Sequence, residues 1–311
     1  MNEQINRRVL LERSAGMALA AGAALAGPPA ARAVDRPIPS DLPKPPTRRT
    51  FKLGLVTHDV AADWDLETII RRCREVGLAG VEFRSTHKHG VEPALTKAQR
   101  QEVRKKCADG GLEIWGLGST CEFHSPDPAV LARKLEEARR FIDLAHDLGA
   151  KAVKVRPNDL PREVPEDKTL EQIGRALRTC GEAGAQAGIQ IACEVHGRGT
   201  CEPPRMRKIL DIAGHPNVGA VWNSNQPDIK DGSVKVAFEL LRRDLFHVHI
   251  NELISGYPWR ELFTLLSEAG YNGYTMIEAQ PLKSANIDDN VRWLKYYKAL
   301  WEQLSQPAQA E

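Results

Sequence analysis

The chain has 311 residues, of which 42% are hydrophobic and 27% are charged, a composition typical of a folded protein with a sizeable core. Its formal net charge is +2, and removing residues 1–33 leaves 39 basic and 39 acidic residues. A chain so balanced lacks the basic surface that neutralises phosphates, so we expect no nucleic-acid partner.

The N-terminal segment predicts export. Arg7 and Arg8 precede a short alanine-rich apolar stretch, and the small residues at 31–33 are typical of a cleavage site. This pattern resembles a twin-arginine export signal, with an ordinary secretory signal as the alternative. We expect residues 1–33 to be a signal peptide cleaved after Ala33, leaving a periplasmic or otherwise exported protein without stable membrane association. A proline-rich linker (34–50), the folded domain (51–305) and a short tail (306–311) follow.

The six cysteines fall at irregular spacings without a CxxC motif, which argues against a zinc ribbon or a thioredoxin motif. Because disulfides form in exported proteins, Cys193 and Cys201 are a candidate pair.

From residue 51 onward, short apolar runs alternate with segments of helical periodicity. The runs that predict strands cover 51–58, 80–85, 112–118, 151–157, 189–196, 218–225, 245–251 and 274–280. Helical spacing of apolar residues predicts helices around 66–76, 131–145, 170–180, 260–270 and 290–304. A capping-box pattern at 169–172 predicts the start of the third helix, and glycines at 77, 110, 149 and 188 predict helix ends.

Eight strand–helix units in about 250 residues are the number and size expected of a (β/α)8 barrel in the α/β class. A doubly wound open sheet is the alternative, but it usually carries a glycine-rich phosphate turn after its first strand. The segment "LVTHDVAADWD" has no such turn. The predicted barrel places its functional site at the C-terminal ends of the strands.

Polar side chains occur where the predicted strands end, whereas the strand centres are apolar. They include Glu82, Arg84, Lys154, Arg156, Glu194, His196, Asn223, His247, His249 and Glu278. Glu194, His249 and Glu278 offer oxygen and nitrogen donors that suit Mn, Mg, Co or Zn. Two carboxylates beside a metal-bound sugar carbonyl can exchange a proton with carbon, which is isomerase or epimerase chemistry.

The segments "EVHGRGTCE", "VWNSN", "HVHINE" and "MIEAQP", with "GVEFRSTHKHGVE" upstream, resemble the sugar phosphate isomerase/epimerase family of xylose-isomerase-like barrels over residues 51–305. The resemblance implies one divalent metal ion held by Glu194, Asn223, His249 and Glu278, with Glu194 and Glu278 as the catalytic carboxylates. Asn223 stands where the family has an aspartate, so weaker metal binding is expected. His249 is the implied ligand, and His247 is expected to lie one layer below the metal.

Other side chains are candidates for substrate binding, namely His196, Glu82, Lys154, Arg156, Gln226 and Arg260. Gln226 and Ser255 stand where the family pattern has a histidine and an arginine, and Arg260 or Arg156 is the candidate substitute for that arginine.

These observations predict a divalent-metal-dependent isomerase or epimerase of an unphosphorylated sugar or polyol, acting through an enediolate. Export favours an unphosphorylated substrate, because sugar phosphates are mainly cytoplasmic. A lyase or dehydratase acting on keto sugars or keto glycosides is an alternative that begins with the same proton abstraction. A non-catalytic carbohydrate-binding barrel is a second alternative, motivated by Asn223, and an oligomer is compatible with the sequence.

Overall fold

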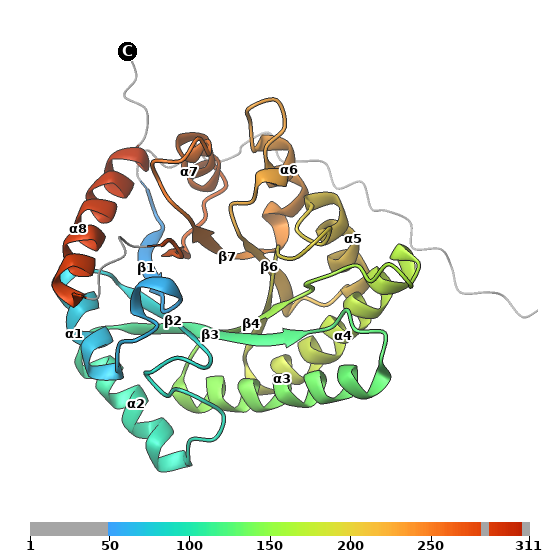
Figure 1. Cartoon of the computed structure of the whole chain (residues 1–311), viewed down its shortest axis with the longest axis horizontal. Coiled ribbons are helices and arrows are strands. Elements are labelled where there is room, and N and C mark those ends of the chain that lie inside the picture. The colour runs from blue at the N-terminus through green and yellow to red at the C-terminus, as the bar shows by residue number, and fades with distance from the viewer. Residues whose placement is uncertain (1–48, 281–285, 307–311) are drawn as a thin grey trace, which may run out of the picture. The chain divides into compact units, whose positions relative to one another are not determined.

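The described part of the chain forms a closed barrel of parallel strands. The structure is a computed structural model that describes residues 49–280 and 286–306. Within these residues, eight strands follow one another around the barrel in sequence order, and β8 pairs with β1 to close it. Helices surround the strands (Figure 1). The predicted (β/α)8 fold is therefore confirmed, whereas the predicted signal peptide with Arg7 and Arg8, the linker up to residue 48 and residues 307–311 of the tail lie outside the described residues.

The strands occupy the predicted apolar runs. They are β1 (Lys52–Val56), β2 (Gly80–Arg84), β3 (Glu113–Glu122), β4 (Ala152–Arg156), β5 (Gln190–Glu194), β6 (Val218–Trp222), β7 (Leu245–Ile250) and β8 (Tyr274–Ile277). Strand β3 continues four residues past its predicted end, and its register with β4 shifts between Gly118 and Glu122. Each run ends close to the polar residues that mark the candidate site.

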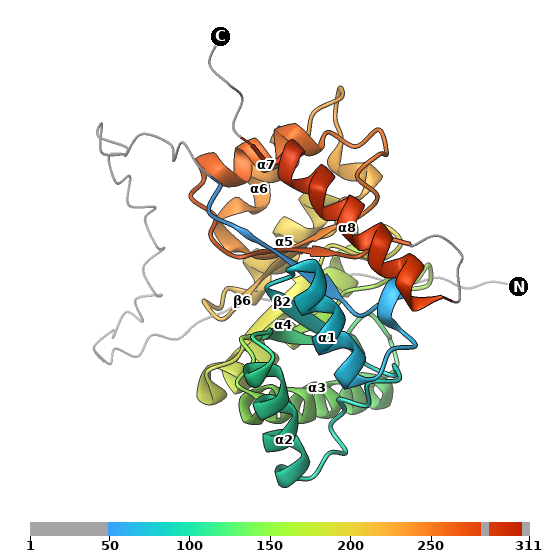
Figure 2. The same ribbon diagram turned by 90° about the vertical axis from the view of Figure 1, so that its left-hand side faces the viewer.

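The outer layer consists of α1 (Leu66–Val76), α2 (Lys97–Asp109), α3 (Pro128–Leu148), α4 (Glu166–Ala187), α5 (Pro203–Ala213), α6 (Lys235–Leu241), α7 (Trp259–Glu268) and α8 (Ile287–Leu304). Short 3-10 segments occur at Asp59–Ala61, Gln226–Asp228 and Arg242–Asp244. Helix α8 lies beside both α7 and α1 (Figure 2), so the last helix closes the ring around the barrel.

Local sequence explains most of the helix ends. Gly77, Gly149 and Gly188 end α1, α3 and α4 in the left-handed conformation that favours glycine. The predicted start of α4 at Thr169 is wrong, because the helix begins at Glu166 and Thr169 is buried within it. Pro165 precedes this helix, and two acidic residues occupy its first turn, where they interact favourably with the helix dipole.

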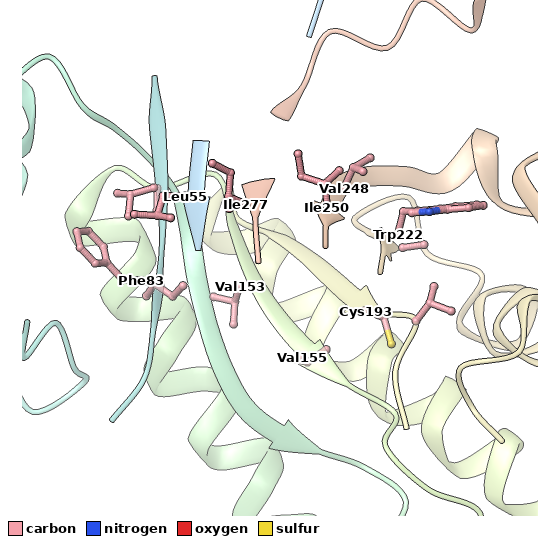
Figure 3. Close-up of a cluster of buried hydrophobic side chains, with 14 of the residues drawn as sticks. Leu55, Phe83, Val153, Val155, Cys193, Trp222, Val248, Ile250 and Ile277 are labelled. Carbon is pink, nitrogen blue, oxygen red and sulfur yellow. The ribbon is translucent and has the colours of Figure 1, made fainter. Parts of the chain in front are cut away.

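Alternation along the strands separates two apolar layers. Leu55, Phe83, Val153, Cys193 and Ile277 belong to the core cluster that includes the helices (Figure 3). The barrel interior holds a second cluster formed by Val56, Trp115, Ala152, Ala192, Val221, Tyr274 and Met276. Four polar residues each come two positions after a member of this inner cluster, namely Lys154, Glu194, Asn223 and Glu278. Side chains two residues apart share a face of a strand, so these four also face the barrel interior. A polar layer therefore lies above an apolar floor.

The cysteines do not cross-link the fold. All six are free thiols, so the candidate disulfide between Cys193 and Cys201 is not formed. Among the described helices, none combines the length and apolar character needed to cross a membrane.

Candidate functional site

A cavity of about 520 Å³ opens at the C-terminal ends of the strands. Its size falls within the range usual for small-molecule sites. The lining side chains come from β2, β4 and β5 and from the segments that follow β1, β6, β7 and β8. Six of the predicted site residues line it together, namely Lys154, Arg156, Glu194, His196, Asn223 and Glu278.

His249 lies fully buried at the centre of the polar layer. Its Nε2 lies 3.0 Å from Oε2 of Glu82, and its Nδ1 lies 3.0 Å from Oε2 of Glu278 and 3.7 Å from Oε1 of Glu194. An ionised carboxylate only accepts hydrogen bonds, so Nε2 donates to Glu82. Nδ1 makes no hydrogen bond of acceptable geometry, which leaves it facing the two other carboxylates.

Four donor atoms near the base of the cavity suit a divalent cation, one each from Glu194, Asn223, His249 and Glu278. Glu194, His249 and Glu278 each offer one ligand atom, and these atoms all lie within 4.8 Å of one another. The Oδ1 atom of Asn223 is buried at the same cavity and has no hydrogen-bond partner among the described residues. A buried polar atom without a partner costs free energy unless a ligand satisfies it. The residues present therefore fit the metal ion that the resemblance implies.

The protonation state of His249 would make cation binding at this candidate site depend on pH. Burial alone would lower the pKa of His249, but the carboxylates of Glu278 and Glu82 hold it well above its usual value. A cation bound by Nδ1 requires the neutral imidazole, so metal and proton compete for the same nitrogen. The hydrogen bond to Glu82 fixes the ring orientation that such a ligand needs.

Lys154 contacts a carboxylate. Its Nζ donates to Oε2 of Glu194 at 2.6 Å, and each side chain is no more than 3% exposed. Although burial alone would raise the pKa of Glu194, the Lys154 charge and the contact with His249 hold it well below its usual range. Lys154 also lines the cavity, but its closest charged partner is Glu194.

Glu82 and His247 lie below the cavity lining. Glu82 was expected to contact the substrate, yet it is fully buried beneath His249 and is not part of the lining. The ring of His247 stacks on Trp115 with an interplanar angle of 12°. Burial lowers the pKa of His247 to about 4, so its ring is neutral. The two residues form the layer that supports His249 from below.

His196 sits at the rim of the site. Its Nδ1 lies 3.0 Å from Oδ1 of Asn158, an interaction that orients the ring. Burial lowers the pKa of His196, and this effect outweighs the opposing charge of Glu194. Because its pKa is lowered, the imidazole is a neutral group that can donate or accept a hydrogen bond in the cavity. Its partner Asn158 adopts a positive φ of 75°.

Two of the predicted substrate-binding residues lie elsewhere. Gln226 is exposed in the 3-10 segment after β6 and is not part of the cavity lining. Arg260 is exposed on α7, where its Nη1 donates to the carbonyl of Gln303. Neither residue joins the site, because motif spacing does not carry over to these segments.

The cavity includes residues that were not selected from the sequence as site residues. Arg84, His58, Asn251 and Glu252 line it together with the predicted set. Arg84 and Asn251 were visible as polar strand ends, and both follow a strand residue of the inner face by two positions. That spacing was the signal that could have selected them.

Two curated proteins of named activity are similar in sequence to this chain. The L-ribulose 3-epimerase of Mesorhizobium japonicum is 24% identical over 260 residues, which cover 78% of this chain and 84% of that protein. The 3-dehydroshikimate dehydratase of Pseudomonas aeruginosa is 28% identical over 152 residues, 48% of this chain and 24% of that enzyme. Curated relatives are thus epimerases and a dehydratase, as expected of an isomerase/epimerase-like enzyme.

Solved structures share the fold. An L-ribulose 3-epimerase superposes with a TM-score of 0.67 at 20% identity, covering 82% of this chain and 95% of that one. A D-psicose 3-epimerase in the presence of D-fructose gives 0.69 at 17% identity, covering 83% and 100%. Residues 70–297 match the family described as "Xylose isomerase-like TIM barrel". Because this match runs from α1 to α8, the chain belongs to the xylose isomerase-like TIM barrel family.

Proposed function

We propose that this protein is a divalent-metal-dependent isomerase or epimerase of a carbohydrate, which moves a proton on carbon between Glu194 and Glu278. The observation that carries this proposal is the placement of both carboxylates around Nδ1 of His249 at the base of the cavity. Two carboxylates that reach one ligand position can serve as base and acid for the same substrate carbon.

The metal ion is proposed to be held by Glu194, Asn223, His249 and Glu278. When bound, it supplies Lewis acidity that polarises the sugar carbonyl and stabilises enediolate charge. The protein supplies the proton transfer. One carboxylate removes the proton next to the carbonyl, and the electron pair moves into the enediolate. The other carboxyl group then donates a proton to carbon, which restores the carbonyl. One proton is removed from the substrate and one is returned to it.

Lys154 supports the assignment of Glu194 as an ionised group. The buried ammonium at 2.6 Å favours the carboxylate over the carboxylic acid, so Glu194 is ready to accept a proton. Glu278 is more exposed, with 17% of its side chain accessible, and it faces the cavity from β8. We assign removal of the proton to Glu194 and its return to Glu278 for one direction of the reaction.

A lyase or dehydratase is the second candidate function. The similarity to a 3-dehydroshikimate dehydratase favours it, since elimination also begins with abstraction of a proton next to a carbonyl. The two outcomes differ only in what leaves the intermediate. Analysis of products after incubation with keto sugars and keto glycosides separates them, because elimination releases water or an aglycone and epimerisation releases nothing.

The proposed substrate is unphosphorylated and is met outside the cytoplasm. This part rests on the N-terminal pattern around Arg7 and Arg8, which predicts export of the chain. Fusion of residues 1–50 to a reporter that is active only after export tests it, with Arg7→Lys and Arg8→Lys together as the matched control. Retention of the wild-type fusion in the cytoplasm would remove the argument for an unphosphorylated substrate.

Deuterium exchange tests the proposed reaction. The wild-type protein with added Mn²⁺ is expected to incorporate solvent deuterium at the carbon next to the carbonyl of a converted keto sugar. Glu194→Gln and Glu278→Gln are expected to lose conversion. Glu278→Gln should keep the wild-type melting temperature within a few degrees, whereas Glu194→Gln should melt lower because it leaves the buried Lys154 without its carboxylate, so its activity is assayed well below its melting temperature. Glu252→Gln, which alters another carboxylate of the same cavity, serves as the control and should remain active. Near-normal turnover in both catalytic variants would rule out the mechanism.

A further inference from the structure

Two arginines line the cavity on the side away from the proposed metal ligands. Arg84 comes from β2 and Arg156 from β4, and β3 lies between these strands in the barrel. The four metal donors come from the segments at the ends of β5, β6, β7 and β8. In a closed barrel of eight strands, β2 lies opposite β6 and β4 lies opposite β8, so Arg84 and Arg156 face the ends of β6 and β8 across the cavity, while β4 also pairs with β5.

Arg84 carries a charge that no carboxylate pairs with in residues 49–280 and 286–306. Its Nη1 donates to the carbonyl and the hydroxyl of Ser85 at 3.0 and 2.9 Å, and both acceptors are neutral. Burial and the nearby charge of Arg156 lower the pKa of Arg84, and they outweigh the opposing charges of Glu194, Glu82 and Glu278. A guanidinium has five N–H donors, so most of those on Arg84 stay available for a ligand.

Arg156 is held in place and is only partly satisfied. Its Nη2 donates to Oε1 of Glu122 at 2.5 Å, which anchors the guanidinium to the end of β3. Its Nε is buried and has no hydrogen-bond partner within residues 49–280 and 286–306. Buried donors of this kind are rare in native proteins and are usually satisfied by water or by a ligand. The pair thus combines one anchored guanidinium with one that is free to bind.

The strand between the two arginines leaves room beside them. Gly118 of β3 has no side chain, and a Cβ atom there would lie 2.6 Å from Oε1 of Glu82 and 3.3 Å from Cδ of Arg84. The first distance is shorter than real Cβ contacts, so a larger residue would displace Glu82 or Arg84. Glycine at this position lets the side chains of Glu82 and Arg84 lie against β3.

The charged side chains of the lining form ion pairs with groups other than Arg84 or lie away from β3. The ammonium of Lys154 is paired with Glu194 at 2.6 Å. Asp59 lies 3.2 Å from the imidazole of His58. Glu252 follows β7, on the far side of the cavity from β3, and Glu278 belongs to the His249 group. An anion beside Arg84 would therefore meet a guanidinium that forms no ion pair within the described part of the chain.

We propose that Arg84 and Arg156 form a subsite for an anionic group of the carbohydrate, a carboxylate or a phosphate, while its reacting carbons lie at Glu194 and Glu278. This inference rests on the proposed function and defines its substrate class as acidic sugars. The planar guanidinium matches the geometry of either anion, and paired donors of this kind give strong, charge-assisted hydrogen bonds. Predicted export favours the carboxylate, that is, a keto sugar acid.

A matched set of three sugars tests the subsite by isothermal titration calorimetry with Mn²⁺ present. D-fructose, D-fructuronate and D-fructose 6-phosphate share the keto group and differ in whether the far end is a hydroxyl, a carboxylate or a phosphate. At least one anion is expected to bind the wild-type protein on the order of ten to a hundred times more tightly than D-fructose. The preferred anion identifies the source of the negative charge, and a preference for D-fructose 6-phosphate would support the subsite while contradicting the proposal of an unphosphorylated substrate.

Arginine variants connect that preference to the subsite. Arg84→Met and Arg156→Met are expected to abolish it, while Arg84→Lys keeps part of it because the charge remains. Arg198→Met is the control, since Arg198 is 59% exposed and pairs with Asp159 outside the cavity lining. Melting temperatures confirm that each variant is folded. The proposal is overturned when neither anion binds the wild-type protein more tightly than D-fructose, or when the preference survives Arg84→Met.

Deuterium exchange with the same sugars separates failure of the subsite from failure of the proposed function. Arginine-dependent binding of an anion without exchange at carbon contradicts the isomerase assignment and supports the subsite. Exchange on D-fructose without any preference for the anions supports the assignment and contradicts the subsite.

Discussion

Replacing Lys154 with methionine tests the buried ion pair at the base of the cavity. Both members are almost inaccessible, with 2% of Lys154 and 3% of the Glu194 side chain exposed, and the atoms lie 2.6 Å apart. Methionine keeps most of the side-chain volume but leaves Glu194 as a buried carboxylate without its closest cation. Removing one partner from a buried pair typically lowers the free energy of unfolding by about 3–5 kcal/mol. For a domain of this size, that corresponds to a fall in melting temperature of roughly 10 °C.

The pH dependence of this loss has a defined sign. In the wild-type protein the pKa of Glu194 is lowered, so its contribution to stability is present above the usual glutamate pKa and is lost as the pH falls through the lowered value. In Lys154→Met, burial without the lysine raises the pKa of Glu194. The folded variant then binds a proton more tightly than the unfolded chain, so its deficit should be larger at pH 8 than at pH 5.

Urea unfolding in a chelating buffer measures this effect without a contribution from bound metal. Lys168→Met is a suitable control, because Lys168 is 72% exposed and its contact with Glu171 is a surface ion pair worth little. The double variant Lys154→Met/Glu194→Gln removes both charges and should recover part of the lost stability. A loss below about 1 kcal/mol for Lys154→Met, or a double variant less stable than the single one, would refute the reasoning.

Three further outcomes are expected. Glu82→Gln should weaken Mn²⁺ binding about ten- to a hundredfold, because the charge that orients His249 is lost, and unchanged affinity by calorimetry would contradict this. Asn223→Asp should tighten Mn²⁺ binding by adding a charged ligand, whereas equal affinity would show that this amide does not face the ion. Asp228 is buried, and burial raises its pKa to about 7 despite hydrogen bonds from Tyr257 and Asn225. Its folded pKa is raised, so stability falls as the pH rises from about 4 to about 7, and Asp228→Asn should stabilise the protein by up to about 4 kcal/mol at pH 8 and by about 1.5 kcal/mol at pH 5. Equal gains at both pH values in urea unfolding would contradict that explanation.

Fold and strand ends could be predicted because they depend on local patterns. The apolar runs and the helical segments between them predict the barrel. Side chains two residues apart share a face of a strand, so the sequence alone places Glu194 and Glu278 at the mouth of the barrel. Helix ends at glycines such as Gly149 could also be predicted, because a left-handed residue at a helix end is most often glycine.

Contacts between side chains on different strands could not be predicted in the same way. Whether Lys154 reaches a substrate or Glu194 depends on the stagger between β4 and β5, which the pattern of either strand does not encode. Glu82 likewise points at His249 because β2 and β7 meet across the barrel, although they are separated by 167 positions in the chain. Arg260 was selected by its distance along the sequence from a family position, and its place on the outer face of the barrel depends on how the β7–α7 segment folds.

The stack of Trp115 on His247 has a consequence for how the enzyme handles its ligands. Together with the inner apolar cluster, it seals the barrel beneath the donors, so the described cavity is reached from the C-terminal side. Substrate and product of the proposed reaction would then use one entrance, so a new substrate molecule could not enter until the product had left. Product inhibition of such a chamber is competitive, and a bulky glycoside that blocks the mouth would trap the smaller ligand behind it.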